Sequence, residues 1–367
     1  MNKGSIRKRR TAISSLFVVV AVAACAATTA ACGVDVSRGP GESADGQRFS
    51  ASSRPRRFRE VEWRVLWERG GTESDSVFLM PSELSTDGRH VYVYDMATDH
   101  LLALRAADGS LAWKAGRRGS GPQEFRKAED VAFGATGDLM VADPNNNRIS
   151  LLNPEGKVSS QIPLDAVPYA VSTCSLADGQ VLVSTLGSLT PPIIRLSADG
   201  KVLAQSHLPW PDLKNSPGIV QQGFFVRTRD GKCIYMLALG RGFTVYDGAG
   251  FQPAMPYVES FDLPPVELTP GEKGAPPSTR ILDRTEAAVG AGADEGTLAV
   301  GFWGKTKDQG ELIDLYSLDR GEYLHSFLAP VVFTRLARAG SVYFFESRRD
   351  GYPVLIAAEL REKQPGR

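Results

Sequence analysis

Three carboxylates occupy matching places in the sequence and could together bind a cation. Asp95, Asp143 and Glu346 each stand at the end of a short apolar run that follows a turn glycine. Carboxylate oxygens suit a hard divalent cation such as calcium, provided that the fold brings them to one place. The alternative is that each carboxylate caps its own turn, a common use of acidic side chains beside turns. These three residues are therefore ligand-binding candidates, with the metal unknown and no other cofactor expected.

Two more side chains are candidates for contact with a ligand. Arg148 follows Asp143 across an asparagine-rich loop, where it either pairs with that aspartate or a neighbouring strand or meets a ligand. Trp210 lies in Leu208-Pro209-Trp210-Pro211, which is predicted to be a loop. The proline-rich segment from Leu263 to Ser278 is a further long loop, and long loops on rigid scaffolds often carry binding residues.

Catalytic motifs are absent from the sequence. The four histidines, His90, His100, His207 and His325, stand in unrelated strand or loop contexts. There is no Gly-x-Ser-x-Gly nucleophile motif, and the glycines near residue 120 lack the following Lys-Ser/Thr of a phosphate-binding loop. We assign no catalytic residue and favour a binding protein over an enzyme.

The first 32 residues have the pattern of an export signal. Basic residues between Lys3 and Arg10 precede a stretch from Thr11 to Ala31 that contains no charged side chain. Val22-Ala23-Ala24 stands directly before Cys25 and resembles a bacterial lipobox, so Cys25 is the preferred lipidation site and Cys32 the alternative. Ordinary signal-peptidase cleavage and an uncleaved membrane anchor stay open, and all three outcomes export the rest of the chain.

Residues 33–57 are predicted to be a flexible linker. They are rich in glycine, serine and charged residues and show no apolar periodicity, so they cannot bury enough surface to fold. With a lipid on Cys25, this linker would tether a folded domain to a membrane. The expected location is accordingly a membrane-anchored lipoprotein or a periplasmic or extracellular protein.

Two cysteines remain in the folded part. Export makes a disulfide between Cys174 and Cys233 chemically feasible. Their placement in neighbouring repeat units would nevertheless separate them beyond the distance of about 7 Å between Cα atoms that a disulfide tolerates. We expect buried free thiols.

Charge and composition exclude one class of partner. Lys and Arg together number 42, as do Asp and Glu, so the chain has no net field that would attract nucleic acid. The 37 glycines and 23 prolines are spread along the chain, which indicates many tight turns.

A repeat of β-strands organises the chain. Apolar runs recur after glycines spaced 49, 42, 52, 65 and 44 residues apart, namely Gly88, Gly137, Gly179, Gly231, Gly296 and Gly340. A second Asp-Gly or Glu-Gly turn follows in most units, as at Gly109 and Gly156, so that each unit contains two hairpins. A period of about 40 to 50 residues is typical of a four-stranded propeller blade.

The sequence thus predicts an all-β, six-bladed β-propeller over residues 58–367. The sixth unit lacks its last strand because the chain ends soon after Gly351, whereas Val61 to Trp67 has the alternation of a strand. We expect this N-terminal strand to complete the last blade, which would remove the exposed edge of an open sheet.

One stretch resembles a known repeat. Gly119-Ser120-Gly121-Pro122-Gln123-Glu124-Phe125, followed by Val131 to Ile149 with Asp143-Pro144-Asn145-Asn146-Asn147-Arg148, is similar to the NHL repeat of six-bladed propellers. Elsewhere the match fades: blade three has Ser184-Thr185 where the repeat has Ala-Asp, and Ala106 to Lys114 resembles a quinoprotein repeat, which leaves a propeller with more blades as an alternative. The whole chain resembles TolB-like lipoproteins of bacterial envelopes.

The resemblance leaves two functions open. The first is a monomeric, envelope-exported scaffold that binds a protein, peptide or glycan. The second is an exported hydrolase or lyase, similar to propeller lactonases, with a metal at the central channel. Related lyases use three histidines and related lactonases a Glu/Asn/Asp calcium site, and neither set is evident in this sequence.

Overall fold

The computed structural model describes residues 54–75, 77–167, 169–186, 192–214, 216–269 and 278–362. The expected signal peptide, with Cys25 and Cys32, lies outside these residues, as does most of the expected linker. The chain divides into two compact units, of which the larger comprises Gln47–Glu267 and Ile281–Arg367. β18 (Val266–Thr269) and β19 (Ser278–Ile281), which lie mostly in the smaller unit, pair as a two-stranded sheet.

The larger unit is a β-propeller of six four-stranded antiparallel sheets, as the sequence predicts. Blade one contains β2 (Pro81–Thr86), β3 (His90–Asp95), β4 (His100–Arg105) and β5 (Leu111–Ala115), and blade two contains β6 (Asp130–Phe133), β7 (Leu139–Asp143), β8 (Arg148–Leu152) and β9 (Val158–Pro163). Blade three contains β10 (Ala170–Ser175), β11 (Val181–Thr185), β12 (Ile193–Leu196) and β13 (Val202–Ser206). Blade four contains β14 (Gly223–Arg227), β15 (Cys233–Leu237), β16 (Gly242–Tyr246) and β17 (Met255–Pro256), and blade five contains β20 (Ala288–Asp294), β21 (Thr297–Phe302), β22 (Leu312–Ser317) and β23 (Glu322–Leu328).

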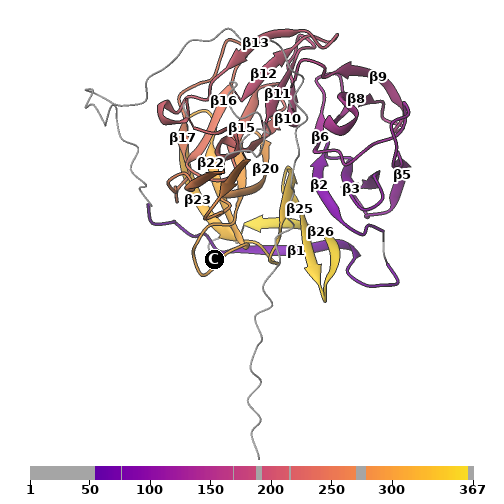
Figure 1. Ribbon diagram of the computed structural model, residues 1–367. Coiled ribbons are helices and arrows are strands. Elements are labelled where there is room, and N and C mark those ends of the chain that lie inside the picture. Colours follow the sequence, from indigo (N-terminus) through magenta and orange to yellow (C-terminus); the bar gives the residue numbers. More distant parts are fainter. Residues whose placement is uncertain are drawn as a thin grey trace, which may run out of the picture. The chain divides into compact units, whose positions relative to one another are not determined.

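Blade six closes the ring with strands from both ends of the chain. Its order is β24 (Arg335–Ala339), β25 (Val342–Arg349), β26 (Tyr352–Glu362) and β1 (Val61–Gly70). β1 runs antiparallel to β26 from the Val61–Glu362 pair to the Gly70–Val354 pair, as Figure 1 shows for the purple and yellow strands. The expectation that the N-terminal strand completes the last blade is confirmed.

The predicted turn glycines explain why the repeat forms. All six glycines that precede the second strand of a blade have φ between 62° and 89°. Only glycine adopts this left-handed region without strain, so the positions of these glycines determine where the hairpins turn. The regular glycine spacing is therefore the spacing of the blades.

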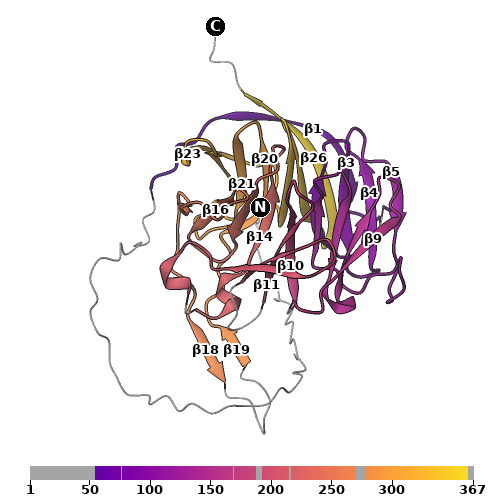
Figure 2. The same ribbon diagram turned by 90° about the horizontal axis from the view of Figure 1, so that it is seen from above.

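The two ends of the central channel differ. Neighbouring innermost strands run in the same direction, because Phe225 meets Ser172 while Arg227 meets Ser175. Figure 2 shows β10, β14 and β20 toward the middle of the ring. The innermost strands begin at one end, which we call the loop face, where connections such as 116–129 and 329–334 run between blades. The opposite end, the turn face, carries tight glycine turns.

The core lies between neighbouring blades. Tyr92 and Tyr94 of blade one pack with Phe125, Val131 and Leu139, which precede or belong to blade two. Burial of side chains of this size contributes about 1.5–3 kcal/mol each, so every blade depends on its neighbours for stability.

Trp67 extends this packing across the closure. Its side chain, which is 8% exposed, packs with Val91 of blade one and Phe344 of blade six. The indole N–H donates a hydrogen bond of 2.8 Å to the carbonyl of Ala106. A Cβ at Gly109 would lie 2.6 Å from the indole ring, so the turn must be glycine for the ring to fit. β1 thus joins blade six to blade one through both hydrogen bonds and packing.

The two cysteines form a disulfide, and the expectation of free thiols is wrong. Cys174 of β10 and Cys233 of β15 are bonded, with their Cα atoms 6.0 Å apart, and both side chains are buried. Strands of different blades were expected to lie far apart. Innermost strands converge on the channel, however, so β10 lies against the face of the next blade and stays within bonding distance.

The propeller also begins earlier than residue 58. Arg56, assigned to the linker from its polar surroundings, has a side chain that is only 8% exposed and forms an ion pair with the buried Asp314 of β22. Arg54 donates its backbone N–H to the carbonyl of Val258 at 2.9 Å. Composition missed this segment because its order comes from buried ion pairs instead of apolar packing.

Replacing Trp67 by alanine tests the closure of the ring. We expect Trp67→Ala to lower the free energy of unfolding by about 3–5 kcal/mol, because it leaves a cavity between blades six and one. Denaturant unfolding of the purified domain measures this change. Arg64→Ala, which alters an exposed side chain of the same strand, is the matched control, and an equal loss in both variants would show that Trp67 does not stabilise the closure.

Candidate functional site

Asp143 and Arg148 hold an inter-blade loop. The Asp143 Oδ2 atom accepts hydrogen bonds from the backbone N–H of Arg126 at 3.1 Å and from the side chain of Asn146 at 2.7 Å. Arg148 donates to the carbonyls of Gly121 and Glu124 at 2.6 and 2.7 Å. The two side chains of the NHL-like motif therefore fasten the 116–129 loop to blade two.

Asp95 has a similar local role in blade one. Its carboxylate accepts the backbone N–H groups of Leu79, Met80 and Ala97 at 2.9–3.1 Å and the hydroxyl of Thr98 at 3.0 Å. These donors satisfy both oxygens, so the carboxylate caps the loops that enter and leave the blade. The turn-capping alternative is the one that these contacts support.

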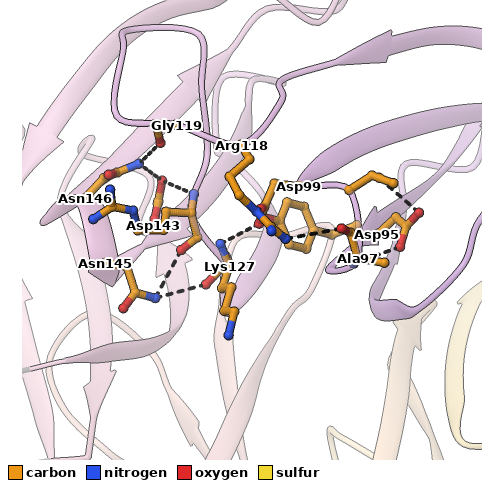
Figure 3. Close-up of polar contacts among 12 residues, drawn as sticks. Asp95, Ala97, Asp99, Arg118, Gly119, Lys127, Asp143, Asn145 and Asn146 are labelled. Carbon is orange, nitrogen blue, oxygen red and sulfur yellow. Dashed lines mark hydrogen bonds and ion pairs between the residues drawn. The ribbon is translucent and has the colours of Figure 1, made fainter. Parts of the chain in front are cut away.

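Asp99 is a structural residue that the sequence analysis did not select. Its buried carboxylate accepts hydrogen bonds from the Tyr94 hydroxyl, the Arg118 guanidinium and the Lys127 backbone N–H, each at 2.6 Å (Figure 3). Burial raises the pKa of Asp99, but these three donors outweigh burial and hold the pKa below its usual value. Asp99 fixes the other end of the loop that Asp143 holds.

The proposed carboxylate set does not assemble into a metal site. In the part of the chain that the structure describes, no group of three or more His, Cys, Asp or Glu side chains is arranged to hold a metal ion. Asp95 and Asp143 serve local donors, while Glu346 lies opposite Arg335 in blade six. The donor set that a metal at the channel would need is therefore not brought together.

Trp210 lies in the core and not on an exposed loop. Its side chain is 2% exposed and packs in one cluster with Cys174, Leu213 and Tyr235. It directly precedes the 3₁₀ helix η2 (Pro211–Leu213). The flanking prolines indicated a loop correctly, but the loop folds inward over the disulfide, so the indole cannot meet a ligand at the surface.

A different polar cluster stands at the loop-face end of the channel. We call it the channel mouth: it contains carboxyl groups from three blades around one guanidinium, together with a tyrosine, namely Glu83, Glu129, Asp130, Tyr169, Arg335 and Glu346. Glu83, Asp130 and Arg335 belong to innermost strands, and Glu129 and Tyr169 directly precede such strands.

Arg335 is the cation of the channel mouth that attracts both Glu83 and Glu346, while Lys127 and Arg348 also act on Glu129 and Glu346, respectively. The Arg335 Nε donates to the carbonyl of Ser82 and its Nη1 to the carbonyl of Thr334, both at 3.0 Å. Although burial opposes its charge, the attraction of Glu83 and Glu346 raises the pKa of the guanidinium. Arg335 is thus fixed by backbone oxygens, and its charge acts to lower the pKa of Glu83 and Glu346 by electrostatic attraction.

Burial raises the pKa of every carboxyl group of the channel mouth. Burial, with the negative charges of Asp130 and Glu129, raises the pKa of Glu83 to about 8 against the opposing effect of Arg335. Glu83 is partly exposed, and burial is the largest cause of its raised pKa. Burial raises the pKa of Asp130 to about 7, although the Thr173 hydroxyl and N–H donate to its carboxylate.

The loop face also holds unusual backbone conformations. Asp99, Lys127, Asn147 and Tyr169 have φ between 29° and 57°, and all four lie in loop-face connections of blades one to three. Such conformations cost about 1–3 kcal/mol each and persist only where surrounding contacts enforce them. The Tyr169 hydroxyl is held by the Glu129 carboxylate at 2.7 Å, which ties one of these residues to the channel mouth.

A pocket of about 420 Å³ lies beside the 116–129 loop. It is lined by Gly116, Arg117, Gly121, Pro122, Gln123 and Glu124. Arg117 and Glu124 form an ion pair of 2.8 Å within it. The pocket adds a concave surface to the same end of the propeller that carries the channel mouth.

Sequence reasoning found one member of the channel mouth, Glu346, and missed the others. A signal was present: Glu83, Asp130 and Arg335 are charged residues inside or at the start of strands that lead into turn glycines. Charged side chains at innermost positions are costly unless they serve a site. The three carboxylates predicted from the sequence all lie on the second strand of a blade, whereas Glu83, Asp130 and Arg335 lie on first strands.

Comparison with known proteins supports the fold and not a particular activity. No protein-family model matches the sequence, and a search of curated proteins finds no match. A "putative exported protein" of Bacteroides fragilis NCTC 9343 is similar over 83% of this chain and 95% of that chain, with 11% identity and a TM-score of 0.55. Virginiamycin B lyase of Staphylococcus aureus covers 82% of this chain and 99% of its own, with 14% identity and a TM-score of 0.47. At these identities the likeness shows the propeller fold alone.

The residues that the structure describes include no helix that is long and apolar enough to span a membrane.

The raised pKa of Glu83 predicts a pH-dependent stability. A carboxyl group with a raised pKa binds its proton more tightly in the folded state, so its stabilising contribution is complete below its usual value of 4.5 and is lost as the pH rises to about 8. We expect Glu83→Gln to remove this loss. At pH 8.5 the variant should exceed the wild type in free energy of unfolding by about 1–2 kcal/mol, after allowance for screening by channel water.

Thermal unfolding between pH 5 and pH 8.5 measures the effect. Glu155→Gln, which changes an exposed side chain in a turn-face turn, is the control. A Glu83→Gln variant whose pH profile coincides with that of the wild type would contradict the assignment.

Proposed function

We propose that the chain is an exported binding protein whose loop face binds a protein, peptide or glycan at the channel mouth. The observation that carries this proposal is the contrast between the two ends of the ring. The loop face combines inter-blade loops, carboxyl groups around Arg335, and five non-glycine residues with left-handed backbone, namely Asp99, Lys127, Asn147, Tyr169 and Asp350. The turn face carries mainly tight glycine turns, and among its described residues Glu295 is the non-glycine residue with positive φ.

The channel mouth suits recognition of polar groups. Arg335 offers a guanidinium, while Glu83 and Asp130, with pKa values of about 8 and 7, accept or donate hydrogen bonds according to their protonation. A ligand that brings donors and acceptors can replace the water around these groups. Hydroxyl, amide and amino groups of a glycan or peptide have this character.

Export is supported by two independent features, and the first of them also supports anchoring. The first 32 residues have the pattern of a lipoprotein signal, with Cys25 as the preferred lipid site and Cys32 as the alternative. The disulfide between Cys174 and Cys233 fits an oxidising compartment outside the cytoplasm. The resemblance to NHL and TolB-like propeller lipoproteins agrees with a monomer held at a bacterial envelope.

One observation favours a second candidate, an exported hydrolase or lyase at the same place. Carboxyl groups with pKa values of about 7 and 8 can exchange protons at neutral pH, as general acids and bases must. The described residues present no donor set for a metal, so this candidate is stated without one. Loss of a chemical step, with ligand binding retained, in a Glu83→Gln variant would favour this candidate.

Ligand arrays test the binding proposal. We expect the purified propeller to bind members of a glycan or peptide array, and a Glu83→Gln/Glu129→Gln double variant to bind them at least about tenfold more weakly, since about 1.4 kcal/mol of lost contact suffices. The turn-face variant Glu155→Gln should bind like the wild type. Equal binding by both variants would place the ligand elsewhere, and no binding to any array would count against these ligand classes.

Mass spectrometry of the mature N-terminus tests the anchor. In a bacterial host we expect a mature chain that begins at Cys25 and carries lipid. The Cys25→Ala variant should accumulate as unprocessed precursor, whereas Cys32→Ala should be processed normally. Lipid on Cys32 would move the site, and an unlipidated mature chain would contradict anchoring.

A further inference from the structure

Arg56 is bound like a ligand in a closed polar slot. Its guanidinium donates to both carboxylate oxygens of Asp314, at 2.9 and 3.0 Å, and to the carboxylate of Glu259. The guanidinium also lies 4.8 Å from the centre of the Phe302 ring. Side-chain exposure is 8% for Arg56 and 0% for Asp314, so the pair is shielded from water.

The backbone on both sides of Arg56 is held as well. Arg54 donates its N–H to the carbonyl of Val258, which follows blade four. Ser326 of β23 donates to the carbonyl of Arg57 at 2.9 Å and accepts the N–H of Arg59 at 2.8 Å, while Phe58 pairs in parallel with Ser326. Residues 54–59 therefore add a short extended segment to the outer edge of blade five, in the manner of an added β-strand.

The chemistry of the slot selects a guanidinium. Asp314 is buried, and burial raises its pKa even though Arg56 and Ser326 donate to it, so removal of the cation would leave a carboxylate in a site that disfavours its charge. The two oxygens of Asp314 match the parallel N–H groups of arginine, and Phe302 offers a ring face to the planar group. Lysine, with a single point charge, cannot make the paired contact.

The slot is separate from the closure of the ring. Its wall comes from blade five and from the segment after blade four, through Val258, Glu259, Phe302, Asp314 and Ser326. β1, by contrast, pairs with β26 of blade six. Docking of residues 54–59 and pairing of β1 thus use different partners, although the two segments are nearly continuous in sequence.

We propose that residues 54–59 form a strap: a peptide that the chain itself supplies to an arginine-specific slot at the junction of blades four and five, and that opens without unfolding the ring. The occupant of the slot is the chain's own segment in cis. This inference does not depend on the identity of the ligand at the channel mouth or on the lipid.

Hydrogen exchange of the full chain tests the strap. In Arg56→Ala we expect exchange at the amides of Arg59 and Ser326 to accelerate at least about tenfold, while amides of β1 and β26 keep wild-type rates. Arg56→Lys, which keeps the charge but not the paired geometry, should fall between the two. Arg54→Ala, which alters an exposed side chain bonded only through its backbone, should exchange like the wild type.

A synthetic peptide of residues 53–60 supplies the second arm. We expect it to bind Arg56→Ala and to slow exchange at Ser326 again, whereas the same peptide with alanine at position 56 should do neither. If Arg56→Ala does not fold, Glu259→Gln weakens the slot while retaining the Arg56–Asp314 pair, and the same amides are compared. The assignment in cis would be overturned by unchanged exchange at Ser326 or by equal acceleration in β1. Absence of peptide binding to an opened slot, or an Arg56-dependent dimer, would overturn it as well.

Discussion

The antiparallel pairing of β1 with β26 is the constraint on which the rest of the structure depends. A propeller sheet buries its faces only against two neighbours, so a ring with one unfinished blade would expose both an edge and a layer of core. β1 supplies the missing edge, and Trp67 carries apolar surface across to blade one. The channel mouth, which takes Arg335 and Glu346 from blade six and Glu83 from blade one, lies at this same junction. Closure of the ring therefore also assembles the polar cluster.

The difference between the two ends of the ring follows from the connections. The first hairpin of each blade closes through a left-handed glycine at the turn face, whereas hairpins between the second and third strands, such as those at Asp99 and Asn147, turn at the loop face. Connections between blades must cross from the outermost strand to the next innermost one, so they are long and free to carry polar residues. Asp95, Asp99 and Asp143 order those connections, because each carboxylate accepts backbone N–H groups that would otherwise lack a partner.

Local features were predictable from the sequence and contacts between blades were not. The turn glycines, the hairpins and the closing strand are set by short-range stereochemistry and alternation, and these predictions are confirmed. Pairing of Cys174 with Cys233, burial of Trp210 and docking of Arg56 depend on how strands far apart in the sequence converge, and these were missed. Of the six channel-mouth residues, only Glu346 was predicted from the sequence. The raised pKa values of Glu83 and Asp130 arise mainly from burial in the folded ring, which the sequence does not show.

Native-state hydrogen exchange across blade six tests the central claim most directly. If both chain ends close one cooperative ring, the amides of β1 paired with β26 exchange only through global unfolding, with the same free energy as those of β25. Exchange of β1 at a free energy well below that of β25, with the other blades still protected, would contradict this account, because the N-terminal strand would then be an appendage and not the element that closes the propeller.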